Sequence, residues 1–194
     1  MDNSKTYQKR KSFALMKEKN KKMGHLLDII FIALFAALIS VFAQIAIPTT
    51  VPFTLQTLGV FISAALLGCK RGTLSVIIYI LLGLIGLPVF SSFSGGLGKL
   101  TGPTGGYIVG FLITAIVIGL MCDLFGRKLW VLITSMTAGL LLCYLLGTVW
   151  FCISSQTEFL SALMLCVVPF LIADAAKIFV ASILVNRLDK IIEL

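Results

Sequence analysis

Two ionisable side chains stand close together in an apolar stretch near the end of the chain. Asp174 and Lys177 lie three residues apart within Pro169–Ser182, whose other residues are mostly aliphatic or aromatic. A charge at the centre of a bilayer costs roughly 2.5–3.5 kcal/mol on insertion scales, so a charged pair there needs a partner or a ligand. Positions i and i+3 share one helix face, so both side chains should point into the protein. The pattern indicates either an ion pair that fixes helix packing or a polar anchor in a ligand pocket, and we favour the pocket.

The composition places these two residues in a membrane. The chain has 194 residues, of which 59% are hydrophobic and 12% charged, against roughly 25% charged in soluble domains. We therefore predict an all-α integral membrane protein, with a basic cytoplasmic tail over residues 1–24 and a single membrane domain over residues 25–194. The net charge is +8, but eight of the sixteen Lys and Arg residues fall within residues 5–22, beside a hydrophobic span. This arrangement is typical of contact with the lipid bilayer rather than with nucleic acid.

Other chemistries find little support in the sequence. Five cysteines are scattered without C-x-x-C spacing and one histidine, His25, stands alone, so no metal site or disulfide framework is predicted. An enzyme would need a nucleophile–base pair or a metal cluster, and a channel would need repeated polar rings. Residues 98–101 look like the end of a P-loop, but the pattern fails at Phe93 and Leu100. We expect no enzyme activity, no bound cofactor and no ATPase site in this chain.

Six apolar stretches are candidate spanning helices: residues 26–47, 57–69, 72–87, 107–125, 129–151 and 169–186. The second is too short, because a span usually takes about 17–25 residues. Either this helix begins near Pro52 or part of the segment is not helical. Irregular backbone at membrane depth is tolerated only where it is buried or lines a cavity. Pro48–Gln56, with Gln56 at membrane level, is therefore a candidate pocket wall or lid.

The basic residues orient these spans. With the N-terminus inside, fourteen Lys and Arg residues lie on the inner side, and the outer loops hold only Lys99. This bias predicts cytoplasmic N- and C-termini. The lid segment, the Asp174 end of the last helix and a glycine-rich loop over residues 90–106 then all lie on the outer side. We predict a pocket open to the outer face.

Further candidate residues come from the loop and from two helices. The 90–106 loop contains six glycines, including Gly95 and Gly96, and offers backbone donors that a ligand can approach closely. Tyr79 places a hydroxyl on an otherwise apolar helix. Ala33 and Ala37 form a small-xxx-small face on the first span, which suits either close approach of a partner helix or packing within the protein.

Together these features resemble the BioY family, the biotin-capturing S components of prokaryotic energy-coupling factor (ECF) transporters. The resemblance rests on Val51–Gln56, Leu66–Gly68 with Gly72, Tyr79–Phe90, Gly102–Tyr107 with Gly110 and Phe111, and Pro169 and Phe170 with Asp174 and Lys177. It implies a six-helix bundle in the prokaryotic cell membrane that binds biotin from outside. It also implies partners, namely a transmembrane T component and two cytoplasmic ATPases.

The resemblance assigns roles to several residues. Ala33 and Ala37 match the motif that docks on the T component, and Asp174 and Lys177 match ligand-contacting residues of the last helix. With Tyr107, the predicted ligand-binding set is Asp174, Lys177, Tyr79, Gln56, Gly95, Gly96 and Tyr107. The chain departs from the family in two respects. It has Ile172 and Ala173 where proline and glycine are common, which predicts a more regular helix entry, and its glycine-rich loop lacks an arginine, which leaves Lys99 and Lys177 as cations for a carboxylate.

The predicted function is therefore the high-affinity binding component of a vitamin importer. Asp174 could accept hydrogen bonds from the ureido N–H groups of biotin while Lys177 donates to the ureido carbonyl; the reverse pose pairs Lys177 with the carboxylate. Two alternatives stay open. One is a self-contained secondary carrier for another solute with Asp174 as a protonatable site, and the other is a structural membrane protein whose Asp174–Lys177 pair only locks packing.

Overall fold

A computed structural model of the chain describes residues 3–47 and 51–190, with side chains over residues 23–47 and 51–190. This part is almost entirely helical. Its long helices are α1 (Asn3–Gln44), α2 (Gln56–Leu84), α4 (Gly105–Phe125), α5 (Leu129–Ser155) and α7 (Leu171–Asp189). Its short elements are strands β1 (Ala46–Ile47) and β2 (Phe53–Thr54), helices α3 (Leu97–Thr101) and α6 (Phe159–Cys166), and the 3-10 turns η1 (Ser91–Phe93) and η2 (Val168–Phe170).

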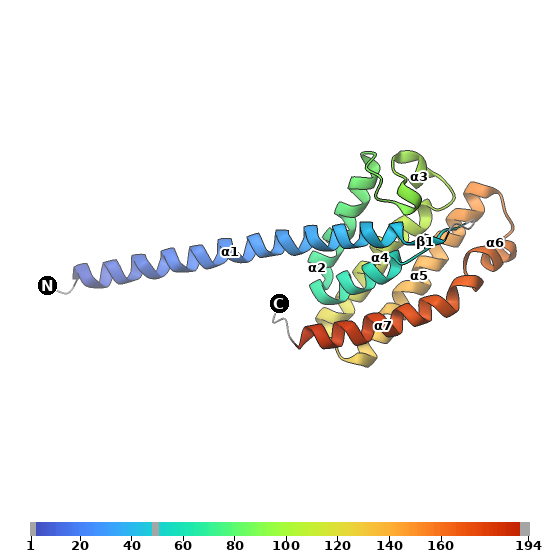
Figure 1. The fold of residues 1–194 in the computed structure, drawn as a ribbon. Helices are drawn as coiled ribbons and strands as arrows, with labels where there is room; N and C mark the ends of the chain where they lie inside the picture. Colours follow the sequence, from blue (N-terminus) through green and yellow to red (C-terminus); the bar gives the residue numbers. More distant parts are fainter. Residues whose placement is uncertain (1–2, 48–50, 191–194) are drawn as a thin grey trace.

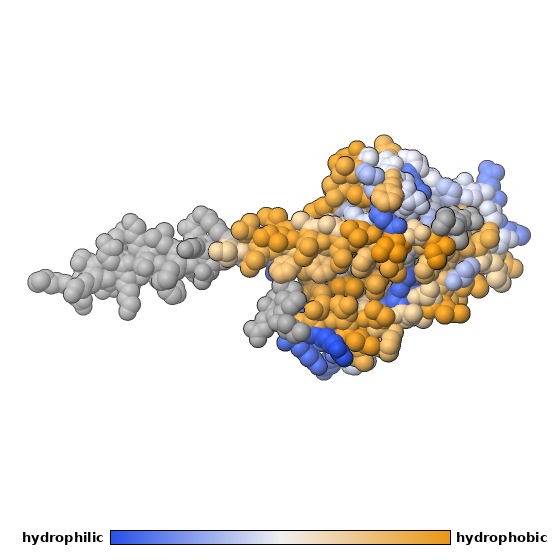
Figure 2. All heavy atoms as spheres, viewed as in Figure 1, coloured by the Kyte–Doolittle hydropathy of each residue, from blue (hydrophilic) through white to orange (hydrophobic). Residues whose placement is uncertain are grey.

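The surface of the bundle is that of a multi-pass membrane protein. Five helices of the described part are long and apolar enough to cross a bilayer. Large aliphatic side chains stand outward, among them Ile172 at 87% and Ile153 at 75% exposure. Figure 2 shows a broad hydrophobic surface over the helices, with hydrophilic residues mainly towards the two ends of the body. Exposure of such a surface to water would be strongly unfavourable, whereas contact with the acyl chains of a bilayer carries no such cost.

One element, α2, takes the place of the second and third predicted spans. It is not a straight helix, because Gly68 has φ 76° and ψ −175° and interrupts it. The two arms fold back on each other: a Cβ added at Gly72 would lie 2.7 Å from the Cα of Ala64. In a continuous helix these two residues would be about 12 Å apart along the axis at about 1.5 Å per residue. Glycine is required at the reversal because side chains disfavour a positive φ.

Polar side chains from the last turn of α4 and from the turn between α4 and α5 satisfy backbone groups that this reversal frees. The guanidinium of Arg127 donates to the carbonyls of Ala65 and Leu66, over 2.6 and 2.8 Å, at the end of the first arm. The carboxylate of Asp123 accepts from the N–H of Cys69, at 2.9 Å, where the second arm begins. Arg127 also pairs with Asp189 at the end of α7, at 2.9 Å. These contacts supply partners for helix-end groups that would otherwise lack them.

The helices form one bundle with two distinct ends (Figure 1). Helix α4 packs between α2 and α5, and α1 packs chiefly on the two arms of α2. We call the end with β1, β2, η1, α3 and the start of α7 the pocket end. The opposite end holds the Gly68 reversal, the α4–α5 turn and the end of α7. Figure 1 shows that α1 begins and α7 ends on the side of this opposite end.

Element boundaries differ from the predicted ones in a few places. Helix α1 begins at Asn3, so the backbone of the predicted tail, from Asn3 onward, continues into the first span as one helix. The last span begins with the short turn η2, which places Pro169 in its first residues, as predicted. The short helix α6 precedes this turn. Met1, Asp2 and residues 48–50 and 191–194, which belong to the predicted tail, lid and C-terminus, lie outside the described residues.

Candidate functional site: a buried acid–base pair in a pocket at one end of the bundle

Asp174 and Lys177 lie in the first turns of α7, directly after η2. Their side chains form an ion pair with 2.7 Å between Lys177 Nζ and Asp174 Oδ1. The Lys177 side chain is only 7% exposed and the Asp174 side chain 3% exposed. The i, i+3 spacing places both on the face of α7 that packs against α2 and α5. Removal of two charges from water is costly, so the pair requires further hydrogen bonds to persist.

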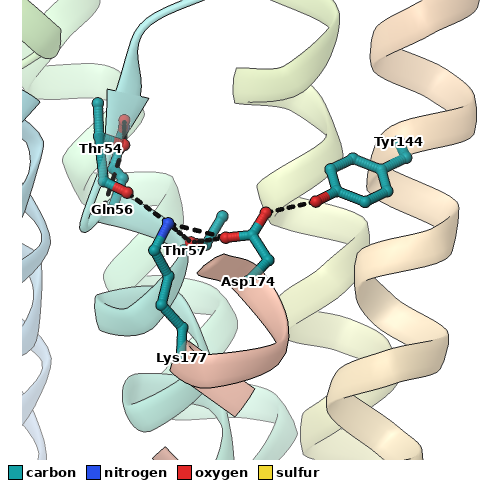
Figure 3. Close-up of polar contacts among 6 residues, drawn as sticks. All are labelled: Thr54, Gln56, Thr57, Tyr144, Asp174 and Lys177. Atoms are coloured by element: carbon teal, nitrogen blue, oxygen red, sulfur yellow. Dashed lines mark hydrogen bonds and ion pairs between the residues drawn. The ribbon is translucent and has the colours of Figure 1, made fainter. Parts of the chain in front are cut away.

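Those hydrogen bonds come from two other helices and from the β2 strand (Figure 3). Lys177 Nζ donates to the carbonyl of Thr54 at 2.6 Å and to the hydroxyl of Thr57 at 3.1 Å. The Thr57 hydroxyl donates in turn to Asp174 Oδ1 at 3.2 Å, and the Tyr144 hydroxyl donates to Asp174 Oδ2 at 2.5 Å. Both oxygens of the carboxylate therefore have donors, and α2, α5 and α7 meet at one carboxylate.

An aromatic ring completes the surroundings of the ammonium group. Lys177 Nζ lies 4.3 Å from the ring centre of Phe53, a cation–π distance. Phe53 stacks in turn on Phe170, with ring centres 5.7 Å apart. Phe53 belongs to β2, which pairs with β1 as an antiparallel hairpin. The hairpin thereby lies against the charged pair.

A pocket opens beside the pair at the pocket end. It contains about 650 Å³ of empty space, part of it open to solvent. Its apolar lining is Val51, Pro52, Phe90, Ile108, Phe111, Leu140 and Phe170. Its polar and thiol lining is Thr54, Gln56, Thr57, Ser91, Thr104, Tyr107, Cys143, Tyr144, Cys166, Asp174 and Lys177. A molecule with a polar head and an apolar body suits such a wall.

The structure brings four of the seven predicted ligand-binding residues to this pocket: Asp174, Lys177, Gln56 and Tyr107. Tyr79 lies behind the wall, fully buried, and its hydroxyl is hydrogen-bonded to the Gln56 amide. Gly95 and Gly96 are absent from the lining, as is Lys99. Their loop nevertheless reaches the pocket through Phe90, Ser91 and Thr104.

Tyr107 is fixed at the start of α4 by contacts with α5. Its hydroxyl lies 3.3 Å from the Thr148 hydroxyl, and its carbonyl accepts from the Cys143 thiol at 3.7 Å. Gly147 lets the ring approach, because a Cβ at that position would overlap the Tyr107 ring. The residue thus forms a firm part of the pocket wall.

Three residues that hold the pair were not predicted as ligand-site residues, namely Thr54, Thr57 and Tyr144. Tyr144 carried a usable signal, since it places a hydroxyl within the apolar helix Leu129–Ser155 and a buried phenol usually finds a hydrogen-bond partner. The two threonines carried less, because the contact with Thr54 uses its backbone carbonyl. Every residue type carries a main-chain carbonyl, so a contact of this kind cannot be predicted from the residue type.

Ala33 and Ala37, the predicted docking residues, are both exposed on α1. The buried face of this helix consists instead of Ile32, Ala36, Ile39 and Ala43, which pack on the body. The alternative of packing within the protein therefore does not apply to the Ala33 and Ala37 side chains in this structure. Within residues 23–47 and 51–190, no three His, Cys, Asp or Glu side chains are grouped so as to hold a metal ion.

Comparison with known proteins gives consistent matches over most of the chain. The model of the BioY family matches residues 14–194. A biotin transporter BioY of Thermotoga maritima is 46% identical over 160 residues, which cover 81% of this chain and 93% of that protein. A probable biotin transporter BioY of Pyrococcus horikoshii is 42% identical over 163 residues, which cover 84% of this chain and 96% of that protein.

A solved structure shares the fold. The crystal structure of the S-component for biotin from an ECF-type ABC transporter superposes with a TM-score of 0.81 at 30% sequence identity. The match covers 86% of this chain and 93% of that one. The helical arrangement described above is therefore that of a biotin S-component.

Proposed function

The chain belongs to the BioY family, and we propose that it captures biotin in the pocket beside Asp174 and Lys177 as the S component of an ECF-type vitamin importer. Its relatives are named transporters, and its role is transport rather than catalysis. The observation that carries the proposal is a buried, hydrogen-bonded acid–base pair that lines a pocket in a bundle of membrane-spanning helices. Charges at such a depth are retained where they serve a ligand.

Biotin complements this pocket group by group. Its ureido ring offers two N–H donors and one carbonyl acceptor, which match the carboxylate of Asp174 and the ammonium of Lys177. Its thioether ring and valeryl chain are apolar and match Phe90, Phe111 and Leu140. Its carboxylate prefers water and would face the open side of the pocket. Because water solvates the carboxylate in this pose, it needs no buried cation. This agrees with the position of Lys99, which lies outside the lining.

The membrane arrangement follows from the same proposal. The two arms of α2 cross the bilayer separately, the short first arm together with the non-helical segment that precedes it, which gives six crossings with both termini in the cytoplasm of a prokaryotic cell. The pocket then opens to the outer face, where the β1–β2 hairpin and the loop from Phe90 to Thr104 close over biotin. The basic residues at the opposite end, among them Lys70, Arg71, Arg127 and Lys128, support this orientation.

Energy for release must come from other subunits under this proposal. A transmembrane T component would dock on the exposed face of α1 at Ala33 and Ala37, where small side chains let another helix approach closely. Two cytoplasmic ATPases would drive the cycle.

Ligand-dependent stability of the purified protein tests the central step. Biotin should raise Tm, because a ligand that binds only the folded state stabilises it by mass action. Valeric acid, which carries the chain and carboxylate but no ureido ring, is the matched control and should leave Tm unchanged at the same concentration. If biotin has no more effect than valeric acid, the proposal fails.

A further inference from the structure

Gln44, the last residue of α1, bonds across to the loop between α2 and α3. Its side-chain amide Nε2 lies 3.2 Å from the carbonyl of Pro88 and 3.2 Å from that of Phe90, and its Oε1 accepts from the N–H of Phe93 at 2.8 Å. Nε2 also lies 3.2 Å from the carbonyl of Ser40 in its own helix. A single side chain therefore holds three main-chain groups of a loop more than forty residues away in sequence.

The loop that Gln44 holds is part of the pocket wall. Phe90 and Ser91 line the pocket. The Phe90 ring is 1% exposed and meets Tyr79 edge to face, with ring centres 5.5 Å apart. Tyr79 is hydrogen-bonded to Gln56, another lining residue. The backbone position of Phe90 therefore sets the position of several pocket groups together.

The backbone of this loop is strained, although Phe90 N–H donates to the Ser94 carbonyl at 2.9 Å and Gly96 N–H donates to the Gly83 carbonyl of α2 at 2.7 Å. Ser92 and Phe93 are two consecutive residues with positive φ, at 60° and 53°, a conformation that costs roughly 1–3 kcal/mol for each non-glycine residue. The Phe93 side chain is 72% exposed, so packing does not hold it. The Gln44 hydrogen bond to the Phe93 N–H joins α1 to the strained point itself. A bond from Ser94 Oγ to the carbonyl of Ser91, at 2.6 Å, is internal to the loop and cannot fix it to the body.

The end of α1 is also joined to the other wall of the pocket. The carbonyl of Ile45 accepts from the N–H of Leu55 at 3.2 Å, and β1 pairs with β2, which carries Thr54. Any displacement of α1 relative to the body must stretch the Gln44 contacts and these backbone bonds together.

We propose that Gln44 is a positioning residue of the ligand site: it fixes the Phe90–Ser91 wall to the end of α1 and thereby sets how long the bound ligand stays. This inference rests on the proposed biotin pocket. It adds a link between α1, the helix with the exposed alanine face, and the wall that retains the ligand. Gln44 itself does not line the pocket, so its effect passes through the loop.

Dissociation of radiolabelled biotin from the purified full-length protein tests the role of Gln44. Gln44→Met has nearly the same length but makes no amide hydrogen bonds, and Gln44→Glu keeps the acceptor for Phe93 while removing the donors to Pro88 and Phe90. Both should raise koff about tenfold, the effect of losing two or three modest hydrogen bonds, with the number of binding sites per protein unchanged. Ser40→Ala, which removes only a bond within α1 from Ser40 Oγ to the carbonyl of Ala36, is the control and should keep koff within twofold of the original chain.

Amide hydrogen exchange without ligand gives a second readout. Amides over residues 90–94 should exchange faster in Gln44→Met than in Ser40→Ala. An unchanged koff in both Gln44 variants overturns the inference. Fewer binding sites with an unchanged koff also overturn it, because that result reports misfolding instead of a change in the pocket wall. If the original chain binds no biotin, the proposed function fails, and unchanged exchange over residues 90–94 in Gln44→Met would then separately overturn the role of Gln44.

Discussion

The hydroxyl of Tyr144 on α5 donates a hydrogen bond of 2.5 Å to Asp174 Oδ2 on α7. This contact lies in the wall of the pocket, because both residues belong to its lining. It holds one carboxylate oxygen while Lys177 and Thr57 hold the other. The orientation of the carboxylate therefore depends on α5 as well as on α2 and α7.

Replacement of Tyr144 tests this dependence. Tyr144→Phe keeps the ring and removes one donor from a buried carboxylate, a loss of about 1–3 kcal/mol. We expect biotin affinity to fall about 5- to 150-fold, as measured by equilibrium binding. Tyr7→Phe in the tail is a matched control and should bind as the original chain does. Equal affinity in the Tyr144→Phe and control proteins would show that the carboxylate needs no support from α5.

Replacement of either residue of the Asp174–Lys177 pair should have the largest effect on biotin binding. Asp174→Asn removes the partner of a buried ammonium and one acceptor for the ligand, which costs about 3–5 kcal/mol where a buried pair is broken. Binding should be lost or weakened by about 150-fold or more. Asp28→Asn, at a half-exposed ion pair with Arg71, is the control and should bind normally. Unaltered affinity in both Asp174→Asn and Lys177→Ala would rule out a ligand role for the pair.

A biotin analogue can show which group of the ligand Lys177 contacts. If Lys177 donates to the ureido carbonyl, biotinamide, which lacks the carboxylate charge, should bind within a few-fold of biotin. If Lys177 pairs with the carboxylate, biotinamide should bind about 1.5–3 kcal/mol more weakly, the usual contribution of a hydrogen bond to a charged group. Competition against radiolabelled biotin distinguishes the two poses, and we expect the first.

The exposed alanines on α1 predict a defect in uptake alone. Ala33→Trp and Ala37→Trp fill a face on which another helix could approach closely, and neither residue lines the pocket. Biotin binding to the purified variants should be unchanged, while uptake into cells that supply the partner subunits should stop. Leu34→Trp enlarges a side chain that is already large and exposed, and should have a smaller effect. Normal uptake with both alanines enlarged would contradict the docking assignment.

The segments at the pocket end should become ordered with ligand. Saturating biotin should slow hydrogen exchange over residues 51–56 and 90–104 more than over residues 70–72 and 126–128 at the opposite end. The reason is that closure excludes water and strengthens the hydrogen bonds of a charged site. Slowing confined to residues 70–72 and 126–128 would require the lid assignment to be abandoned.

Sequence alone determined the membrane class, the charged pair and much of the pocket. Apolar runs have only one way to satisfy their backbone groups in lipid, so the helices were predictable from composition and length. Asp174 and Lys177 were predictable because charge is costly in that setting and their spacing fixes a shared face. The short second span, with Pro48 and Pro52 before it, indicated irregular backbone next to a cavity, and Val51, Pro52, Thr54 and Gln56 do line the pocket.

Only the tertiary structure decided how these pieces meet. The reversal at Gly68 brings Gln56 beside Tyr79, an encounter that depends on main-chain geometry and on Arg127 from another helix. The contacts of Lys177 with the Thr54 carbonyl and of Gln44 with Phe93 use backbone groups, which every residue type carries. Tyr144 reaches Asp174 only because α5 packs beside α7. Residue types and spacing specify local helices and the cost of burying a charge, whereas the partners of a buried group depend on which segments the fold places within about 3 Å of it.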